Sequence, residues 1–221
     1  MERYEVNLTG AAPLLLHADD LAWRAELDKW LAVPEHKKAS KAGDDRTPAW
    51  KWIGYCYHDG HVLGMPSDNL MTAMREGGAQ VPTGKRGGTY KKQSQSGIVV
   101  DQLIWPLAGA IGEVVQYEPI KALLTEKDYE KHEEAVKPLG FWLFAKGAKV
   151  GQSKHVRVRP RFDTWSCSGT VTVVDETITA EILQTILDMA GMYCGLGDWR
   201  PSSPSKPGPF GRFRADVRRI R

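Results

Sequence analysis

The chain has 221 residues, of which 42% are hydrophobic, and a net charge of +3. That length and apolar content suffice for one large domain with a buried core and exclude a disordered tail. No apolar run reaches the length of a membrane span, and the first residues do not resemble a signal peptide. Cys56, Cys167 and Cys194 are too few and too far apart for a disulfide framework or a zinc cluster. We therefore expect a cytoplasmic protein without a cofactor or metal.

The basic residues gather in the C-terminal part of the chain. From residue 146 to the end, thirteen Lys and Arg face seven Asp and Glu, whereas residues 112–137 hold four Lys against seven acids. Clustered positive charge in a chain of mild net charge indicates a patch for a polyanion. The eight tryptophans also suit single-stranded nucleic acid, because bases stack on aromatic rings while phosphates pair with cations. The alternative is that most tryptophans lie in the core.

The N-terminal part predicts a strand followed by irregular segments. Residues 2–9 alternate between apolar and polar side chains, as in a half-buried strand. Residues 19–31 predict a short helix. Residues 35–48 are polar without periodicity and predict an exposed, mobile loop. The candidate nucleic-acid contacts in this loop are Lys37, Lys38, Lys41 and Arg46.

Residues 50–65 predict a hairpin that turns at Asp59-Gly60, and residues 67–77 predict a helix. Three potential metal ligands occur in the hairpin. A tight hairpin sends neighbouring side chains to different faces, and no fourth ligand is near, so we predict no metal site there. These residues are Cys56, His58 and His61.

Residues 83–97 contain four basic residues, four glycines and no acid. Their spacing does not match the phosphate-loop motif of nucleotide hydrolases. We predict a mobile basic loop that closes over a nucleic-acid strand, with contacts from Lys85, Arg86, Tyr90, Lys91 and Lys92. Further along, residues 98–105 predict a strand, 125–137 a solvated acidic helix, and 141–144 a buried strand or turn.

The clearest alternation in the chain is His-Val-Arg-Val-Arg-Pro-Arg-Phe at residues 155–162. Alternate side chains of a strand point to opposite faces, so the basic residues share one face. Adjacent arginines repel one another unless anions lie against them, and the neighbouring strand predicted at 165–174 offers Ser and Thr in place of acids. The pattern favours nucleic-acid contact, with salt bridges as the alternative. The residues of this face are His155, Arg157, Arg159 and Arg161.

The C-terminal segment predicts a helix over 179–193, capped by Thr179 and stopped by Gly195, and a final strand over 210–220. The loop over 195–213 is rich in glycine and proline. Such a loop can present backbone N–H groups, arginines and an aromatic ring to a base-bearing anion, although a flexible connector is the alternative. The candidate contacts are Gly195, Gly197, Trp199, Arg200, Gly211 and Arg212.

Together, the elements predict an α+β fold in one domain spanning residues 1–221. The order strand (2–9), helix (67–77), strand (155–162), strand (165–174), helix (179–193), strand (210–220) is the βαββαβ pattern of ferredoxin-like and RRM-like sheets. Long insertions are expected at about 10–66 and 80–150.

Both ends of the chain carry recognisable motifs. Leu8-Thr-Gly-Ala-Ala-Pro-Leu-Leu-Leu-His17 resembles the first strand and turn of the RAMP superfamily, whose RRM-like members form backbone and processing subunits of CRISPR effector complexes. Gly195-Leu-Gly-Asp-Trp-Arg and Phe210-Gly-Arg-Phe213 resemble the C-terminal glycine-rich loop of that superfamily. The two ends are also similar to small phage-borne proteins.

The resemblance implies a thumb-like insertion at 80–150, a finger segment at 35–48, and a role in antiviral defence. It implies a homo-oligomer that assembles along single-stranded nucleic acid, RNA by default, with room for further effector subunits as partners. A metal-independent RNA endonuclease that uses His17 is a competing hypothesis, since processing members often use a histidine soon after the first strand. A phage single-stranded DNA-binding or recombination factor, and a protein-binding phage factor with exposed tryptophans, are two more.

Overall fold

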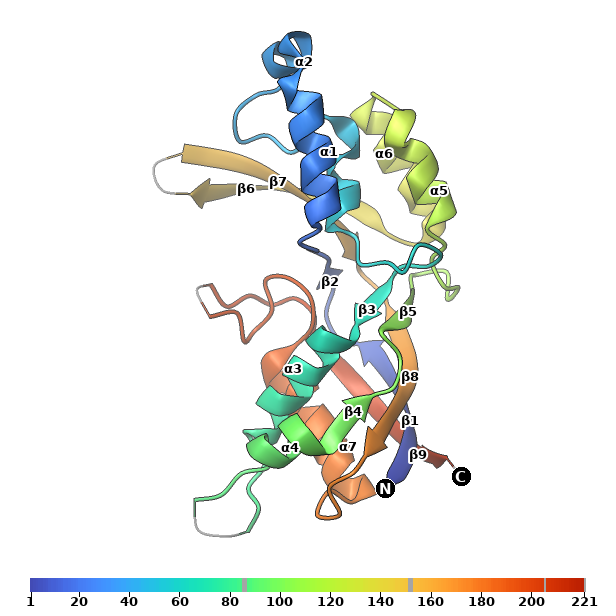
Figure 1. The fold of residues 1–221 in the computed structure, drawn as a ribbon, viewed down its shortest axis with the longest axis vertical. Helices are drawn as coiled ribbons and strands as arrows, with labels where there is room; N and C mark the ends of the chain where they lie inside the picture. The colour runs from blue at the N-terminus through green and yellow to red at the C-terminus, as the bar shows by residue number, and fades with distance from the viewer. Residues whose placement is uncertain (85–86, 151–152, 205, 221) are drawn as a thin grey trace.

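The computed structural model describes residues 1–84, 87–150, 153–204 and 206–220. Lys85 and Arg86, two of the predicted contacts, lie outside these ranges. The molecule is elongated (Figure 1), with the termini close together at one end. A large sheet backed by helices forms the lobe that contains the termini, and a smaller sheet with several helices forms the second lobe.

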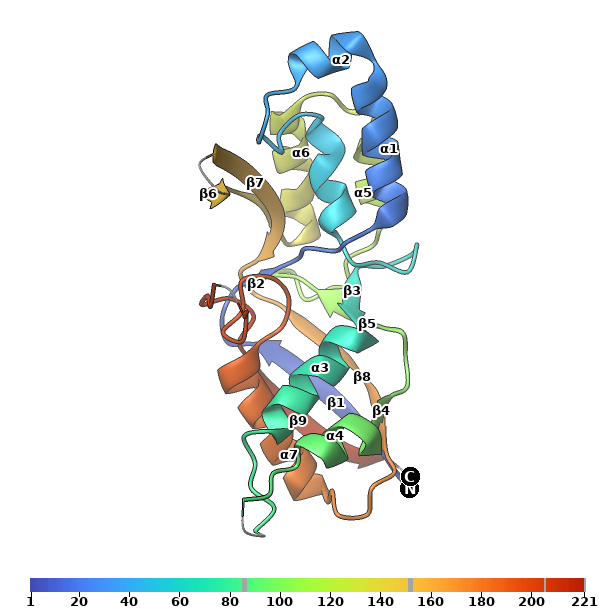
Figure 2. The same ribbon diagram turned by 60° about the vertical axis from the view of Figure 1, so that its left-hand side comes forward.

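The large sheet is antiparallel, in the order β3-β5-β8-β1-β9, and β4 also pairs with β8. One of its inner strands, β1, alternates as predicted, because Tyr4, Val6 and Leu8 are fully buried while the residues between them are not. Helices α3 and α7 cover the buried face (Figure 2). The bounds are β1 Glu2–Gly10, β3 Gly64–Pro66, α3 Ser67–Gly78, β4 Ile98–Val100, β5 Ile104–Ala108, β8 Ser166–Val173, α7 Ala180–Met189 and β9 Phe213–Ile220.

This order confirms the α+β, ferredoxin-like fold class with two helices and long insertions. In chain order, the fourth strand (β9) lies beside the first (β1), then the third (β8), then the second (β4 and β5). The assignment of residues 155–162 as the second strand was wrong. β4 and β5 fill that position, because Ile98 pairs with Val173 and Leu107 pairs with Cys167, while residues 155–162 belong to the smaller sheet.

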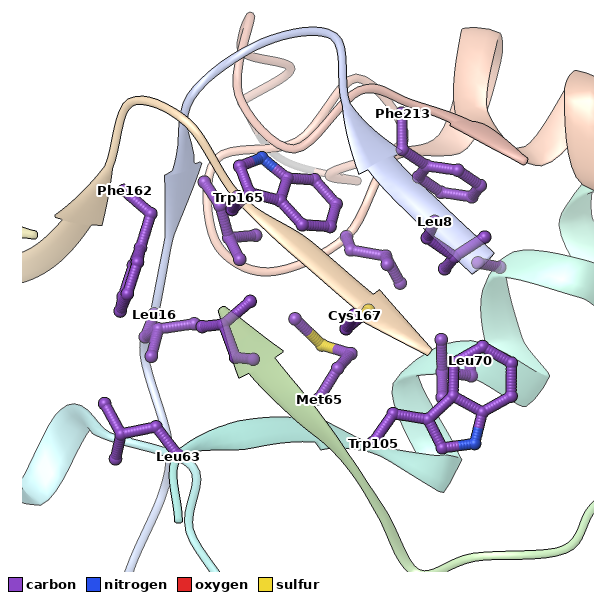
Figure 3. Close-up of a cluster of buried hydrophobic side chains, with 14 of the residues drawn as sticks. Leu8, Leu16, Leu63, Met65, Leu70, Trp105, Phe162, Trp165, Cys167 and Phe213 are labelled. Carbon is purple, nitrogen blue, oxygen red and sulfur yellow. The ribbon is translucent and has the colours of Figure 1, made fainter. Parts of the chain in front are cut away.

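One hydrophobic core runs through both lobes. Figure 3 shows side chains from the large sheet, among them Leu8, Cys167 and Phe213, converging on a cluster that continues to Leu16 and Phe162. Trp52, Trp105 and Trp165 are fully buried in it. For these three tryptophans the core interpretation is therefore correct, and they cannot stack on a ligand in this conformation.

The second lobe contains a three-stranded sheet in the order β2-β7-β6. Short helices pack around it (Figure 1). The bounds are β2 Leu14–Leu15, α1 Leu21–Ala32, α2 Pro34–Ala39, η1 Ala49–Tyr55, α5 Glu118–Lys121, η2 Ala122–Thr125, α6 Tyr129–Val136, η3 Lys137–Leu139, β6 Trp142–Val150 and β7 Ser153–Phe162. The remaining helix, α4 (Lys91–Gly97), lies in the first lobe.

Several local predictions need correction in this lobe. Residues 34–39 form α2 where an irregular loop was predicted, with Pro34 at a position that suits the first turn of a helix. Residues 49–55 form a 3₁₀ helix, so the first arm of the predicted hairpin is not a strand. The turn at Asp59-Gly60 is confirmed, because the Asp59 carboxylate accepts hydrogen bonds from the N–H groups of His61 and Val62.

The C-terminal helix begins as predicted and ends differently. The Thr179 hydroxyl accepts a hydrogen bond from the Ile182 N–H at 3.4 Å, which confirms the cap. Regular α-helix ends at Met189, and a π-helical turn, η4 (Ala190–Cys194), completes the element. Gly195 ends that turn and its N–H donates to the Ala190 carbonyl at 2.9 Å, so the predicted stop is confirmed.

The outer edge of β9 is covered by one side chain from α7. In the described part of the sheet, β9 pairs with β1 alone. The Gln184 amide donates to the Ala215 carbonyl at 2.9 Å and accepts from the Val217 N–H at 3.1 Å. A neighbouring strand would bond to these same groups, so Gln184 competes with the pairing of a further strand at the middle of this edge.

Candidate nucleic-acid interface

The hairpin of β6 and β7 presents a basic and aromatic face. Because the strands are antiparallel, Trp142 lies opposite Arg161, Phe144 opposite Arg159 and Lys146 opposite Arg157. The side chains between the arginines point the other way, and Val158 and Phe162 are fully buried. The predicted alternation of β7 is therefore confirmed. We call the six side chains the hairpin face: Trp142, Phe144, Lys146, Arg157, Arg159 and Arg161.

The glycine-rich loop, residues 195–212, packs against this hairpin and β2. Gly197 is buried with φ of 72°, and a Cβ there would lie 2.3 Å from the Leu15 carbonyl oxygen. Gly211 is buried with φ of 73°, and its Cβ would lie 1.8 Å from the Leu196 carbonyl oxygen. Only glycine tolerates both conditions. These glycines, with the buried Gly195, thus bring the loop close to the rest of the chain.

Acidic residues lie against two of the three arginines. Arg159 forms an ion pair with Asp198 of the glycine-rich loop, with Nε and Oδ2 2.5 Å apart. Arg161 pairs with Asp163, just beyond β7, at 2.7 Å. Salt bridges thus form, but the acids come from a distant loop and an adjacent turn, and not from the neighbouring strand. Arg157 has no carboxylate partner among the described residues.

Aromatic rings of the loop and the hairpin gather around the basic groups. The Lys146 ammonium lies 3.7 Å from the centre of the Trp199 ring. The Phe210 ring is 5.4 Å from Trp199 and 6.0 Å from Phe144. The Arg161 guanidinium lies 4.6 Å from the Trp142 ring, which is 36% exposed. Cations over aromatic faces are favourable contacts, and the same groups can stack on bases and pair with phosphates.

His17 lies where β2 meets the hairpin face and the loop. Its Nδ1 is 3.6 Å from Asp198 Oδ2, and its ring meets the Tyr55 ring edge-on at 4.6 Å. The side chain is 34% exposed, at a cavity of about 140 Å³ that Arg157 also lines. Burial lowers the pKa of His17, Asp198 raises it, and Arg159 and Arg157 lower it. The net lowering favours a neutral imidazole near pH 7.

A second hollow, of about 600 Å³, lies on the opposite side of the glycine-rich loop. Lys91 and Gln95 of α4 line it together with Arg75 of α3, Tyr193 and Ser202. Two segments that the sequence singled out separately, 83–97 and 195–213, therefore meet at one hollow. The hairpin, the loop and residues 79–84 project from the same side of the molecule (Figure 1).

The remaining predicted contacts are spread out. Lys37 and Lys38 lie exposed on α2, and Lys41 is exposed beyond it. Arg46 pairs with Asp44 at 2.6 Å, and His155 packs against Gly43 at the far end of β7. Of the last four, three donate hydrogen bonds within the protein: Tyr90 to the Thr177 carbonyl, Arg200 to the Ser202 hydroxyl and the Gly197 carbonyl, and Arg212 to the Met192 carbonyl. Lys92 is exposed.

Sequence reasoning missed four members of this site and both acids. Trp142, Phe144 and Lys146 alternate along β6, a signal that could have placed them on one face, but residues 141–144 were assigned to a buried strand or turn. Nothing in the local sequence links Phe210 to Phe144, or Asp198 to Arg159. Those contacts depend on how the loop folds over the hairpin.

The open face of the large sheet is polar, and several of its charges are paired. Arg3 pairs with Asp101 at 3.0 Å, and Arg218 pairs with Glu5. The Thr170 and Thr172 hydroxyls donate to the same Asp101. RNA-binding sheets of the RRM type stack bases on aromatic side chains of this face, and the described residues of β1, β8 and β9 provide none there. The candidate interface is therefore the hairpin and loop.

Potential metal ligands are scattered over the part of the chain that the structure describes. Within the described ranges, no group of three or more His, Cys, Asp and Glu side chains is arranged to hold a metal ion. Cys56 is buried and His58 stacks on Tyr117 at 3.8 Å. As for membranes, none of the described helices combines the length and apolarity needed to cross a bilayer.

Comparison with known proteins gives matches among solved structures. No protein-family model matches the sequence, and no curated protein matches it either. Among solved structures, the chain is similar to the crystal structure of Cmr6 from Pyrococcus furiosus, with 11% sequence identity, a TM-score of 0.36, and coverage of 96% of this chain and 97% of that one. The fold class itself rests on the strand order and pairing described above.

Proposed function

We propose that this protein binds single-stranded nucleic acid along the hairpin face and the glycine-rich loop. The observation that supports this most is the alternation of cations and aromatic rings where the two meet, with Lys146 over Trp199 and Arg161 over Trp142. The phosphates of a strand can pair with the cations, and its unpaired bases can stack on the rings. A double helix hides the faces of its bases, so a single strand fits this chemistry better.

RNA is the ligand we propose first, with several copies bound side by side on one strand. Sequence-specific proteins recognise RNA mainly in single-stranded regions, where bases are free to stack on aromatic rings. The hollow beside Lys91 and Tyr193 lies on the opposite side of the same loop. It would extend the contact of each copy beyond the hairpin face.

The test removes two charges from the hairpin face. Lys146→Ala with Arg157→Ala takes away two cations that have no carboxylate partner among the described residues. Each phosphate contact contributes a slope of about −0.7 to the dependence of log affinity on log salt for single strands. We expect the double variant to bind a fluorescent 20-nucleotide RNA more weakly and with a slope smaller by about 1.4.

Arg218→Ala with Arg219→Ala is the matched control, because it removes the same charge from β9. There Arg218 pairs with Glu5 and Arg219 pairs with Glu2. We expect this control to retain the wild-type salt slope. Equal losses in both double variants would show general charge attraction without a site, and no binding by the wild-type protein would refute the function. A single-stranded DNA of the same sequence tests the preference for RNA.

We propose metal-independent RNA cleavage at His17 as the second candidate function. The observation that favours it is the half-exposed imidazole beside Asp198 and Arg157 at a small cavity. A neutral imidazole can accept a proton from a 2′-hydroxyl, and a nearby guanidinium can stabilise the developing charge. Burial and Asp45 raise the pKa of Tyr55 to about 12, which keeps that phenol protonated.

Incubation of labelled RNA with the protein in EDTA tests this activity. Discrete products are expected from the wild-type protein, with a loss of about 100-fold or more in rate for His17→Ala. Binding by that variant should persist, since the cations of the hairpin face are unchanged. Intact RNA in the presence of a wild-type protein that binds it would exclude the cleavage activity and leave the binding function standing.

A further inference from the structure

Two consecutive loop residues, Asp198 and Trp199, occupy the middle of the hairpin face. The Asp198 carboxylate lies 2.5 Å from Arg159 Nε and 3.6 Å from His17 Nδ1. The Trp199 ring lies 3.7 Å from the Lys146 ammonium and 5.4 Å from the Phe210 ring. An anion and an aromatic ring therefore lie side by side, the anion against a guanidinium and an imidazole, and the ring against a cation and a second ring.

A nucleotide offers the same two groups in the same relation. Its phosphate is an anion that guanidinium groups and imidazole N–H donors recognise, and its base is an aromatic ring that stacks on Phe or Trp and lies under cations. The Arg159 side chain is only 16% exposed with Asp198 in place. A strand that reaches Arg159 must therefore compete with this carboxylate.

The contacts that hold Trp199 in place can break without disturbing the pairing of any β-strand. Backbone hydrogen bonds of residues 199–209 lie within the loop or reach Cys194, and none of those described joins β6 or β7. The Asp198 N–H donates to the Leu15 carbonyl of β2 at 2.9 Å, so the Asp198 carboxylate must turn away from Arg159 while its backbone stays bonded to β2. Trp199 itself has a φ of 50°, in the left-handed region that non-glycine residues rarely adopt. Gly208 leaves room for it, since a Cβ there would lie 2.2 Å from Trp199 Cδ1.

We propose that the hairpin face contains a subsite for one nucleotide, in which Asp198 takes the place of the phosphate and Trp199 that of the base until a strand displaces them. The phosphate position is formed by Arg159 and His17, and the base position by Lys146 and Phe210. This inference rests on the proposed nucleic-acid binding. It adds that Asp198 and Trp199 fill this subsite when no nucleic acid is bound. The affinity for a strand is therefore limited by the cost of displacing these two residues.

Asp198→Asn tests the subsite because it removes the competing charge and keeps the shape. The amide oxygen can still accept the hydrogen bond that the Asp198 carboxylate now accepts from the Trp199 N–H at 2.8 Å. Asp216→Asn is the matched control, since it changes net charge equally on the exposed surface of β9. We expect Asp198→Asn to bind the 20-nucleotide RNA about two- to tenfold more tightly than the control does.

The outcomes separate this inference from the function on which it rests. If the wild-type protein binds RNA but Asp198→Asn binds no better than Asp216→Asn, or binds worse, Asp198 orients Arg159 and the subsite is refuted while the binding function stands. If none of the three proteins binds, both proposals fail. Thermal unfolding checks each variant, and Asp198→Ser, which also keeps an oxygen acceptor near the Trp199 N–H, replaces Asp198→Asn should that variant unfold.

Discussion

Gly211→Ala is expected to lower the free energy of unfolding by about 2–5 kcal/mol. A left-handed backbone costs a residue with a Cβ about 1–2 kcal/mol, and forcing an extra methyl into a packed site costs about 1–3 kcal/mol more. Both conditions hold at Gly211, where φ is 73° and the Cβ would lie 1.8 Å from the Leu196 carbonyl oxygen. Urea unfolding followed by tryptophan fluorescence measures the loss.

Gly112→Ala is the control that separates the two costs. Its φ of 78° is nearly the same, but no atom lies within 4 Å of the added Cβ. We expect a loss of about 1–2 kcal/mol for this variant. Since Gly211 also donates its N–H to the Pro13 carbonyl at 2.7 Å, a substitution there shifts the loop relative to β2. Equal losses at the two positions would show that the loop is not packed as described.

His132 is expected to make the protein less stable at acidic pH. Its imidazole is fully buried, accepts a hydrogen bond from the Trp52 indole N–H at 3.0 Å through Nδ1, and lies 3.1 Å from the Glu126 carbonyl through Nε2. Burial lowers the pKa of His132 in the folded protein, against smaller effects of Glu126 and Asp128 that raise it. A proton on Nδ1 would also break the bond from Trp52.

The sign of the pH dependence follows from where the proton binds. The unfolded chain takes up this proton near pH 6.5, whereas the folded protein takes it up only at lower pH. The stability that the neutral imidazole provides is therefore complete above about pH 6.5 and is lost as the pH falls toward the folded pKa. One such group changes the free energy of unfolding by at most about 1.4 kcal/mol per pH unit.

His132→Gln isolates this contribution, because the Gln amide can accept from Trp52 and donate to the Glu126 carbonyl without titrating. The burial of His17 and His58 also lowers their pKa values, so the wild-type protein should lose stability between about pH 7.5 and 5 for more than one reason. Urea titrations at both pH values should show a shallower decline for the variant. Parallel declines would mean that His132 takes up its proton as readily in the folded protein as in the unfolded chain.

Elements whose signals are local could be predicted from the sequence. The alternation in residues 2–9 and 155–162 and the cap at Thr179 each depend on neighbours in the chain, and each was confirmed. The pairing of strands, in contrast, joins residues that are far apart along the chain. β4 and β5 are separated by a long stretch of chain from their partner β8, whereas β7 directly precedes it, so proximity along the chain favoured the wrong second strand.

In the candidate site, too, features with a local sequence pattern could be predicted, and contacts between distant residues could not. The basic face of β7 and the glycines of the loop could be identified, because their patterns lie within short stretches. The pairing of Arg159 with Asp198 could not, since the two residues meet only after the loop has folded over the hairpin. Counting charges along the chain revealed an excess of cations in this region, but it could not reveal that the acids lie directly on the arginines.

The side chain of Gln184 limits how copies of this protein can be arranged. A sheet that grows from one molecule into the next would propagate by itself, without reference to any ligand. With the Ala215 carbonyl and the Val217 N–H already bonded to Gln184, the middle of β9 offers no free groups for such growth. If copies gather on a nucleic-acid strand as proposed, their number would then be set by the length of that strand and not by growth of the sheet at this part of β9.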